Sequence, residues 1–493
     1  MSGRRSISFQ QGWSARCGLI ILLVLIAGVP RVISAVFLPN EEGDPYSYLR
    51  AIQIMRAALI DGTFSIPELF GFWLPLYQFV CALISSVVGD PLYVSKLVSA
   101  VCGTGVCLLV FYASMRLTAS VGLAFLSFSL IALNPIHIMY SGFSLTDVPH
   151  ALLVMSGLVC AMASHWILAG ILVAGGGLMR PESWVYIPLL PALQWLVQRR
   201  IAMIPLMIAM AAPAVWIYIS WRATGNPFEY FTVRGEYIRG LLSQAPDLGQ
   251  FSTSNLFVDF RTLFYCSGPA VVISCTIAAF LLVRPRFWLM SHREEAVDEV
   301  RVVTVYFFSS LAFLLFAYFT KNQPAIFARY CLVLFALGLP VLAWILSVAR
   351  TWKRVQRVGL WTLLLSLCAL QFGFQIRDGN IFISHVSQKR FVADYLRNNI
   401  NTTNDAKVFC DDDTVKVLAG IPSATFLSSA SSPEDTKSFL EYLKENHVEF
   451  LVWEKRDQSA AVNLFSELGE DGITQLFQLV ASTSALRVYR VVF

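Results

Sequence analysis

The apolar part of the chain opens with CGLIILLVLIAGVPRVISAVFL at residues 17–38 and continues at once with PNEEGDPYSYLRA at residues 39–51. The first stretch is long enough for a membrane-spanning helix and too long for the apolar core of a cleaved signal peptide, so we expect a retained helix. The second stretch places Glu41, Glu42 and Asp44 beside two tyrosines. Charged side chains at the edge of a bilayer are unfavourable unless they are paired or hydrated, so this acidic loop needs a physical reason.

The composition indicates an integral membrane protein. Hydrophobic residues make up 56% of the 493 residues, charged residues make up 14%, and the mean hydropathy is +0.62. A soluble protein carries about 25% charged residues. The apolar runs are too long for barrel strands, so we predict a polytopic α-helical protein. Most Lys and Arg lie in short loops beside apolar runs, which makes the net charge of +5 a signal of topology and gives no reason to expect a nucleic-acid partner.

Basic residues set the predicted topology. The basic segment 1–16 is expected to be cytoplasmic, and Arg116 and Arg199 are then also cytoplasmic only if the apolar segment 72–89 lies along the interface without crossing. We therefore expect one long outer loop at 39–95. About eleven crossings follow, at 17–38, 96–114, 119–137, 148–164, 166–178, 184–198, 202–220, 262–283, 302–320, 326–349 and 358–374.

The character of the chain changes after the last apolar run. Residues 1–379 are expected to form the membrane domain, whereas 380–493 alternate short β-rich runs with helical patterns and predict a small α/β domain on the outer side. Asp411-Asp412-Asp413 follows one of these runs and is better explained as a helix N-terminus or a solvated turn than as a metal site. Asn401 begins a glycosylation sequon, which has meaning only in a compartment that glycosylates.

Ionisable side chains near the predicted outer helix ends form a candidate site. Such a set is expected to line a water-filled cavity, with carboxylates on one side and cations on the other. Transfer of a group away from a phosphate needs this combination, because a carboxylate takes a proton from the acceptor while cations hold the leaving phosphate. Besides the acids of the first loop, the set contains Asp147, Arg180, Glu182, Lys321 and Arg329.

Each of these residues also has a structural explanation. Asp44 and Asp147 are each followed by a proline within two positions, which is typical of helix N-caps. Arg180, Lys321 and Arg329 are also typical of interfacial cations that extend their charged ends to water. The sequence leaves both explanations open for these two aspartates and three cations.

Six stretches stand in a familiar order across residues 17–350: EEGDPYSYLRA, FWLPLYQF, NPIHIMYSGFSLTDVPHALL, GLMRPESWVYIPLL, ATGNPFEYF and FARYCLVLFALGLP. This order resembles the GT-C class of integral membrane glycosyltransferases. The class depends on polyprenyl- or dolichyl-phosphate sugars and includes protein O-mannosyltransferases and the lipid A aminoarabinose transferase. The resemblance implies inverting transfer of a monosaccharide at the outer membrane face to a lipid, glycan or protein acceptor.

The resemblance also implies roles for single residues. Asp44 corresponds to the general base of the first loop, but Pro45 stands where many members carry a second acid, so Glu41 or Glu42 remains an alternative. Asp147 corresponds to the acid of the second loop, which positions the acceptor or a cation. Tyr330 could equally be a packing residue. The substrate-binding residues implied are Arg180, Glu182, Lys321, Arg329 and Tyr330.

Metal dependence stays open at this point. Some members of the class hold a divalent metal between their loop acids, but the second loop here lacks a DxD pattern. His137 and His150 flank that loop, and two histidines without a third ligand are more typical of structural roles than of a metal site. The sequence therefore assigns no cofactor and leaves a divalent metal as an open alternative.

Other functions also need to be considered. The first is a membrane transporter or flippase for a lipid-linked sugar, which predicts internal repeats and ionisable residues at mid-bilayer depth. A second is a non-catalytic assembly protein of a glycan export system. An oligosaccharyltransferase would carry a DxD second loop, and an O-antigen ligase would carry many Arg and His in residues 221–261, which are poor in both. The expected location is an inner or plasma membrane, or the endoplasmic reticulum of a eukaryote.

Overall fold

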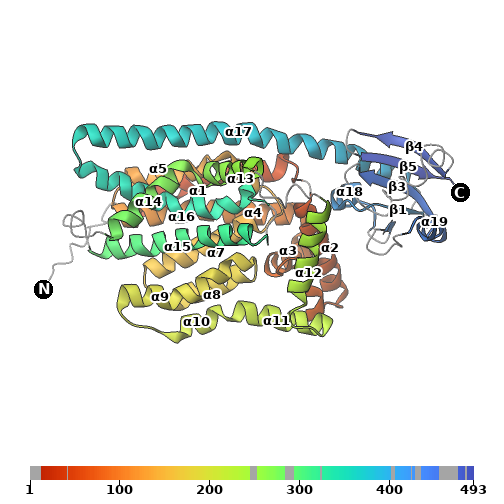
Figure 1. Ribbon diagram of the computed structural model, residues 1–493, viewed down its shortest axis with the longest axis horizontal. Coiled ribbons are helices and arrows are strands. Elements are labelled where there is room, and N and C mark those ends of the chain that lie inside the picture. Colours follow the sequence, from red (N-terminus) through yellow and green to blue (C-terminus); the bar gives the residue numbers. More distant parts are fainter. Residues whose placement is uncertain are drawn as a thin grey trace.

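The chain folds into a helix bundle with a small sheet domain at one end (Figure 1). Several residues considered above, Glu42, Asn401 and the basic residues of segment 1–12, lie outside the described part. The computed structural model describes residues 13–41, 43–244, 253–283, 294–321, 325–400, 406–422, 425–427, 435–454, 476–483 and 486–492.

A helix or a pair of helices occupies each predicted span. They are α1 (Trp13–Phe37), α4 (Pro91–Thr118), α5 (Val121–Ala132) with α6 (Pro135–Ser141), α7 (Asp147–Met162), α8 (Trp166–Gly177), α9 (Tyr186–Gln198), α10 (Met203–Ala209) with α11 (Ala211–Thr224), α14 (Pro269–Val283), α15 (Glu294–Phe319), α16 (Cys331–Val348) and α17 (Arg354–Asn399).

Fewer of these helices than predicted are long enough to cross a membrane alone. Within the described ranges, six stretches qualify by length and composition, and two bent helix pairs raise the number to eight, against the eleven crossings expected. The difference lies in α7, α8 and α9, which have 16, 12 and 13 residues. At 1.5 Å per residue such helices are shorter than the ~30 Å apolar core of a bilayer.

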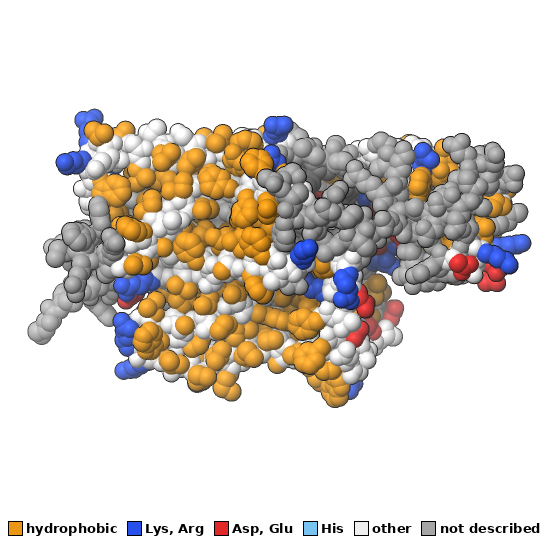
Figure 2. All heavy atoms as spheres, in the orientation of Figure 1, with side chains coloured by type: hydrophobic (Ala, Val, Ile, Leu, Met, Phe, Trp, Pro, Cys, Tyr) orange, Lys and Arg blue, Asp and Glu red, His pale blue; other side chains and the backbone are white. Residues whose placement is uncertain are grey.

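Helix α16 is the centre of the bundle. The membrane-length segment Ala328–Thr351 contains α16, and 94% of its apolar stretch is buried inside the bundle. In the other five long spans the buried share is 22–44%. Those outer helices carry the exposed large hydrophobic side chains, which cover the face of the bundle shown in Figure 2. An apolar surface of this extent is stable against lipid and unstable against water. The protein is therefore an integral membrane protein.

The predicted outer loops contain helices of their own. The loop at 39–95 forms α2 (Asp44–Asp61), the 3₁₀ turn η1 (Ile66–Leu69) and α3 (Leu76–Val88), and α2 packs against α3 near the sheet domain (Figure 1). That α3 lies along the interface remains a prediction. The segment after α11 forms α12 (Glu229–Gln244) and α13 (Thr253–Ser267).

The C-terminal domain is built on a mixed sheet. Its strands are β1 (Lys407–Phe409), β2 (Phe426–Leu427), β3 (Val448–Glu454), β4 (Phe477–Ser482) and β5 (Leu486–Val491), in the order β2-β1-β3-β5-β4. Strand β1 runs parallel to β2 and β3, and β5 runs antiparallel to β3 and β4. One face packs against α17 and α18 (Asp413–Ala419), and the other against α19 (Thr436–Glu445). The predicted α/β architecture is confirmed, and the 46-residue helix α17 runs through the predicted boundary at 379/380.

A buried arginine binds the carbonyl groups left at the break between α5 and α6, which meet at an angle of 61° next to Pro135. Arg31 of α1 is fully buried and donates hydrogen bonds to the carbonyl oxygens of Ile131 (3.0 Å) and Ala132 (3.1 Å), where α5 ends. It also donates to Nδ1 of His137 in α6 at 2.8 Å. Unpaired carbonyls at a helix end within a bilayer are unfavourable, and the guanidinium supplies the missing donors. His137 therefore has a structural partner.

We expect Arg31→Met to destabilise the protein, because it removes the donors for two helix-end carbonyls and for His137. The expected loss is about 3 kcal/mol, from several buried hydrogen bonds made by a charged group. Thermal unfolding in detergent measures it, with Arg222→Met at the exposed end of α11 as the matched control. Equal melting temperatures for the two variants would contradict this role.

Candidate active site

A cavity of about 410 Å³ opens where the helix bundle meets the sheet domain. It is lined by the ends of elements far apart in the sequence: the α1–α2 loop, the first turns of α2 and α7, the 3₁₀ turns η2 (Pro181–Val185) and η5 (Ala328–Tyr330), and α12. The charged side chains of the cavity lie on these segments. The lining includes the predicted site residues Asp44, Asp147, Arg180, Glu182, Arg329 and Tyr330.

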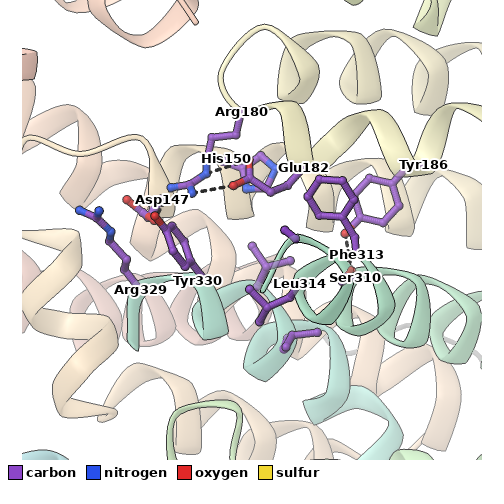
Figure 3. Close-up of a pocket in the computed structure, with 13 residues that line it drawn as sticks. Asp147, His150, Arg180, Glu182, Tyr186, Ser310, Phe313, Leu314, Arg329 and Tyr330 are labelled. Atoms are coloured by element: carbon purple, nitrogen blue, oxygen red, sulfur yellow. Dashed lines mark hydrogen bonds and ion pairs between the residues drawn. The ribbon is translucent and has the colours of Figure 1, made fainter. Parts of the chain in front are cut away.

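Arg180 joins two carboxylates in the wall of this cavity (Figure 3). Its Nη1 forms an ion pair with Asp147 at the start of α7. Its Nη2 and Nε donate to the two carboxylate oxygens of Glu182, at 2.8 and 3.2 Å, in a bidentate arrangement. Burial acts to raise the pKa of Glu182, but the charge and hydrogen bonds of Arg180 lower it to about 2. Glu182 is therefore ionised at neutral pH and keeps Arg180 in place.

Arg329 forms the second ion pair, with Asp44 at the start of α2. The two residues are 285 positions apart in the sequence. The exposed fraction is 14% for the Arg329 side chain and 30% for that of Asp44, so Asp44 lies on the more open side. Nε of Arg329 is buried and has no hydrogen-bond partner among the described residues, whereas the side chain as a whole lines the cavity.

Tyr330 lies between the two guanidinium groups. Its ring centroid is 4.9 Å from Cζ of Arg180 and 5.3 Å from Cζ of Arg329. The electron-rich face of an aromatic ring attracts cations, so one ring holds both charges near the cavity and offsets their mutual repulsion. Tyr330 thus contacts both guanidinium groups as well as lining the cavity.

Helix capping does not explain the two aspartates. Gly43 and Thr146 precede α2 and α7, and neither Asp44 nor Asp147 accepts a described hydrogen bond from the backbone of its own helix. Each carboxylate instead binds a distant arginine. Two buried pairs at a membrane boundary are poor stabilisers, since desolvation offsets most of their attraction. Neither capping nor stability therefore explains the two pairs, and the cavity that they line is the candidate site.

Glu41 differs from the other acids of the cavity. Its Oε2 is buried without a hydrogen-bond partner among the described residues. Burial raises the pKa of Glu41 to about 7, against the opposing effects of Arg329 and Tyr140 and with the nearby charges of Asp147 and Asp44 raising it further. This carboxyl group therefore changes its charge near neutral pH.

Helix α12 adds residues that the sequence analysis missed. Tyr230, Arg234 and Tyr237 lie about one turn apart on the side of α12 that lines the cavity. Arg234 donates to the hydroxyl of Tyr230 at 3.2 Å and forms no ion pair with a carboxylate that the structure describes. The spacing of Tyr230, Arg234 and Tyr237 at helical intervals was the available signal. Arg234 is therefore a third cation of the cavity, and the least engaged.

One predicted residue lies elsewhere in the structure. Lys321 is exposed beyond the end of α15 and is not among the residues that line the cavity, so the structure does not bring it to the site. Glu42 lies outside the described residues. His150 borders the site through its Nε2, which is 2.7 Å from the hydroxyl of Ser183.

A narrower apolar recess of about 50 Å³ adjoins the cavity. Figure 3 shows it running from the pair of Asp147 and Arg180 toward the rings of Tyr186 and Phe313. Its remaining wall comes from α15 and α16. A charged cavity thus continues into an apolar space between two long helices of the bundle.

The donor set for a divalent metal is not assembled in this part of the chain. No three His, Cys, Asp or Glu side chains of the described residues are placed to hold a metal ion. The two loop acids each bind a guanidinium, which takes the position that a cation would need.

Crystal structures of ArnT from Cupriavidus metallidurans are among the solved structures that resemble the chain. The structure bound to undecaprenyl phosphate aligns with a TM-score of 0.58 at 12% sequence identity, over 96% of this chain and 98% of that one. The structure in the apo state aligns with a TM-score of 0.44 at 11% identity, over 96% and 98% of the two chains. No protein-family model and no curated protein matches the chain.

The chain has the GT-C fold. The order of the sequence motifs predicted this fold, and the prediction is confirmed over nearly the whole chain. At 12% identity the likeness establishes the fold alone, so the activity has to be argued from the geometry of the cavity.

We expect the stability of the protein to depend on pH through Glu41. Because its pKa is about 7 in the folded protein and 4.5 ordinarily, protonation favours the folded state. This stabilisation is fully present below about pH 4.5 and is lost as the pH rises through about 7. Glu41→Gln should remove the decline, seen as a smaller fall in melting temperature between pH 5 and pH 8.

Glu441→Gln, at an exposed position of α19, is the matched control and should leave the decline unchanged. A wild-type melting temperature that stays constant or rises between pH 5 and pH 8, with the same profile for Glu41→Gln, would show that Glu41 does not titrate there.

Proposed function

We propose that the protein is an inverting glycosyltransferase that moves a monosaccharide from a polyprenyl-phosphate donor to a lipid, glycan or protein acceptor. The observation that carries this proposal is the joining of Asp44 to Arg329 and of Asp147 to Arg180 in one cavity at the end of the helix bundle. The cavity thus combines carboxylates for proton transfer with guanidinium groups for a phosphate.

The donor fits the combination of a cationic cavity and an apolar recess. The sugar and phosphate would occupy the cavity, and the first isoprenoid units would extend along Tyr186 and Phe313 between α15 and α16. ArnT, which has the same fold, is known in a structure bound to undecaprenyl phosphate. A lipid carrier also suits a site outside the cytoplasm, because it presents the phosphate from within the bilayer.

The transfer is a single displacement. Asp44 accepts the proton of the acceptor hydroxyl, and the acceptor oxygen forms a bond with the anomeric carbon. The bond between that carbon and the phosphate oxygen breaks, and the lipid phosphate leaves with the electron pair. One displacement inverts the configuration of the sugar. Arg234 and Arg329 stabilise the negative charge that develops on the leaving phosphate.

Arg329 links the two halves of this step. Before the donor binds, it is paired with Asp44, which holds the carboxylate in place beside the cavity. When a donor phosphate enters, the guanidinium gains a second anionic partner, and its hold on Asp44 weakens. The base is then released for the acceptor in the presence of the donor.

The cavity and the sheet domain share one side of the membrane in this proposal. Contacts between α2 and α18 place the sheet domain beside the cavity. With the N-terminus in the cytoplasm, both lie on the opposite side of an inner or plasma membrane, or of the endoplasmic reticulum.

We expect Asp44→Asn to lower the transfer rate at least about 100-fold, because the amide has a similar shape and accepts no proton. The assay incubates the purified protein with a panel of radiolabelled polyprenyl-phosphate sugars and follows release of the lipid phosphate. Glu41→Gln is the matched control, an acid of the same cavity that forms no described ion pair with an arginine, and should keep transfer within a few-fold of wild type.

Near-full activity of Asp44→Asn would reject its assignment as the base, and loss of activity in Glu41→Gln alone would assign the role to Glu41. Movement of the intact lipid-linked sugar across a vesicle membrane, without cleavage of any donor in the panel, would instead support a flippase.

Arg234→Gln should raise the KM for the donor about tenfold, since it removes one charge-assisted hydrogen bond to the phosphate. Arg239→Gln changes an exposed arginine of the same helix that does not line the cavity, and it should leave KM unchanged. Melting temperatures measured with undecaprenyl phosphate test the same point without turnover, because a ligand of the folded state stabilises it. Equal stabilisation of both variants would contradict the assignment.

A further inference from the structure

The C-terminal domain contacts the helix that carries Asp44. Its short helix α18 packs against α2, and three polar contacts join them. The backbone N–H of Gly43 donates to Oγ1 of Thr414 at 3.1 Å. The hydroxyl of Ser47 donates to Oδ2 of Asp413 at 2.9 Å, and Nη1 of Arg50 lies 3.0 Å from Oδ1 of the same carboxylate.

These contacts act on the residues next to Asp44 in the chain. Gly43 has φ of 83° and ψ of −118°, a conformation that side-chain-bearing residues rarely adopt, and its carbonyl accepts from the N–H groups of Tyr46 and Ser47. It therefore sets where α2 begins. Ser47 and Arg50 lie one and two turns along the face that starts at Asp44. The direction of the Asp44 side chain follows from how this turn is held.

Helix α18 is in turn held firmly by α17. Asp412 caps α18 by accepting from the N–H of Val415 at 2.9 Å, and it forms an ion pair with Lys389 of α17. At the other end, Arg397 of α17 donates to the carbonyl oxygens of Leu418 and, at 2.8 Å, Ala419. Both ends of this seven-residue helix are thus fixed to one long helix of the bundle.

Asp413 and Thr414 do not reach the reacting groups themselves. Neither is among the residues that line the cavity. Thr414 is 1% exposed, so its hydroxyl is sealed in the interface with α2. Asp413 is shared by Arg50, Lys416 and Ser47, so its carboxylate is fully engaged as a bridge between α2 and α18.

We propose that Asp413 and Thr414 are positioning residues, which hold the first turn of α2 so that Asp44 faces Arg329 in the cavity. The inference rests on the proposed function, since Asp44 is the base there. It gives the C-terminal domain a definite role, because the rigid connection from α17 through α18 fixes the origin of α2, and with it the carboxylate that takes the acceptor proton. The Asp411-Asp412-Asp413 run then contains a cap and a bridge, and its neighbour Thr414 completes the contact.

Thr414→Val tests the proposal, because it keeps a buried side chain of similar size and removes the acceptor of the Gly43 N–H. Hydrogen exchange of the full-length protein in nanodiscs should show the Gly43 amide exchanging about fivefold faster. In the transfer assay, kcat should fall about tenfold while the KM for the donor changes less than about twofold, as expected for a misplaced base beside an intact phosphate site.

Thr414→Ser retains the hydroxyl and loses only a methyl group, so its exchange rate at Gly43 and its kcat should both match those of the wild-type protein. Asp435→Ala is the control for general damage to the domain, since Asp435 caps α19 and makes no described contact with α2. It should lower the melting temperature without changing kcat or exchange at Gly43.

Unchanged exchange at Gly43 in Thr414→Val would overturn the proposal, and so would faster exchange with an unchanged kcat. An equal loss of kcat in Thr414→Ser would also overturn it, because the effect would then come from packing. The exchange measurement needs no substrate. If the wild-type protein transferred no sugar, the proposed function would fail, and exchange at Gly43 would still decide whether α18 holds the start of α2.

Discussion

The pairing of charged side chains at the bundle end joins helix ends that are far apart in the sequence into one site. A carboxylate or guanidinium beside a bilayer is tolerated only with a partner of opposite charge or with water. Asp44 and Arg329 satisfy this from positions 285 residues apart, and Asp147 and Arg180 from positions 33 apart. Each pair fixes two helix ends against one another. Because Tyr330 contacts both arginines, the two pairs form a single unit around one cavity.

The sequence carries much of this information, but not the pairing. Charged residues at the borders of apolar runs are readable, and six of the eight predicted site residues line the cavity. Which cation meets which acid depends on which helices are neighbours, and no periodicity contains that. Lys321 and Arg329 look alike in the sequence, at the two ends of one short loop. The structure separates them: Arg329 lies in η5, directly before the central helix α16, whereas Lys321 stays on the surface after α15.

The features that were missed share a physical cause. Arg31 interrupts an apolar run, but its partners are the carbonyls of a helix break 100 and 101 residues later. Arg234 lies in a segment that mixes polar and apolar residues, and such a pattern is typical of both an amphipathic helix and an irregular loop. The docking of α18 on α2 joins residues more than 360 positions apart. In all three cases the local sequence specifies the side chain, while its partner is set by the tertiary fold.

Ion pairing also suggests how a charged lipid can enter such a site. Arg329 cannot leave Asp44 for bulk water at low energetic cost, because both groups are partly buried. It can, however, be shared with a phosphate that arrives from the apolar recess, since one anion then partly replaces another and no charge is left unpaired. Arg234, which pairs with no described carboxylate, can bind the incoming phosphate before Arg329 moves. Binding of the donor and release of the base would then be one exchange of partners, and a cavity without donor would keep its carboxylate tied to Arg329. In the proposed reaction, the paired resting state is therefore compatible with transfer, because the lipid phosphate carries the charge that replaces the internal partner.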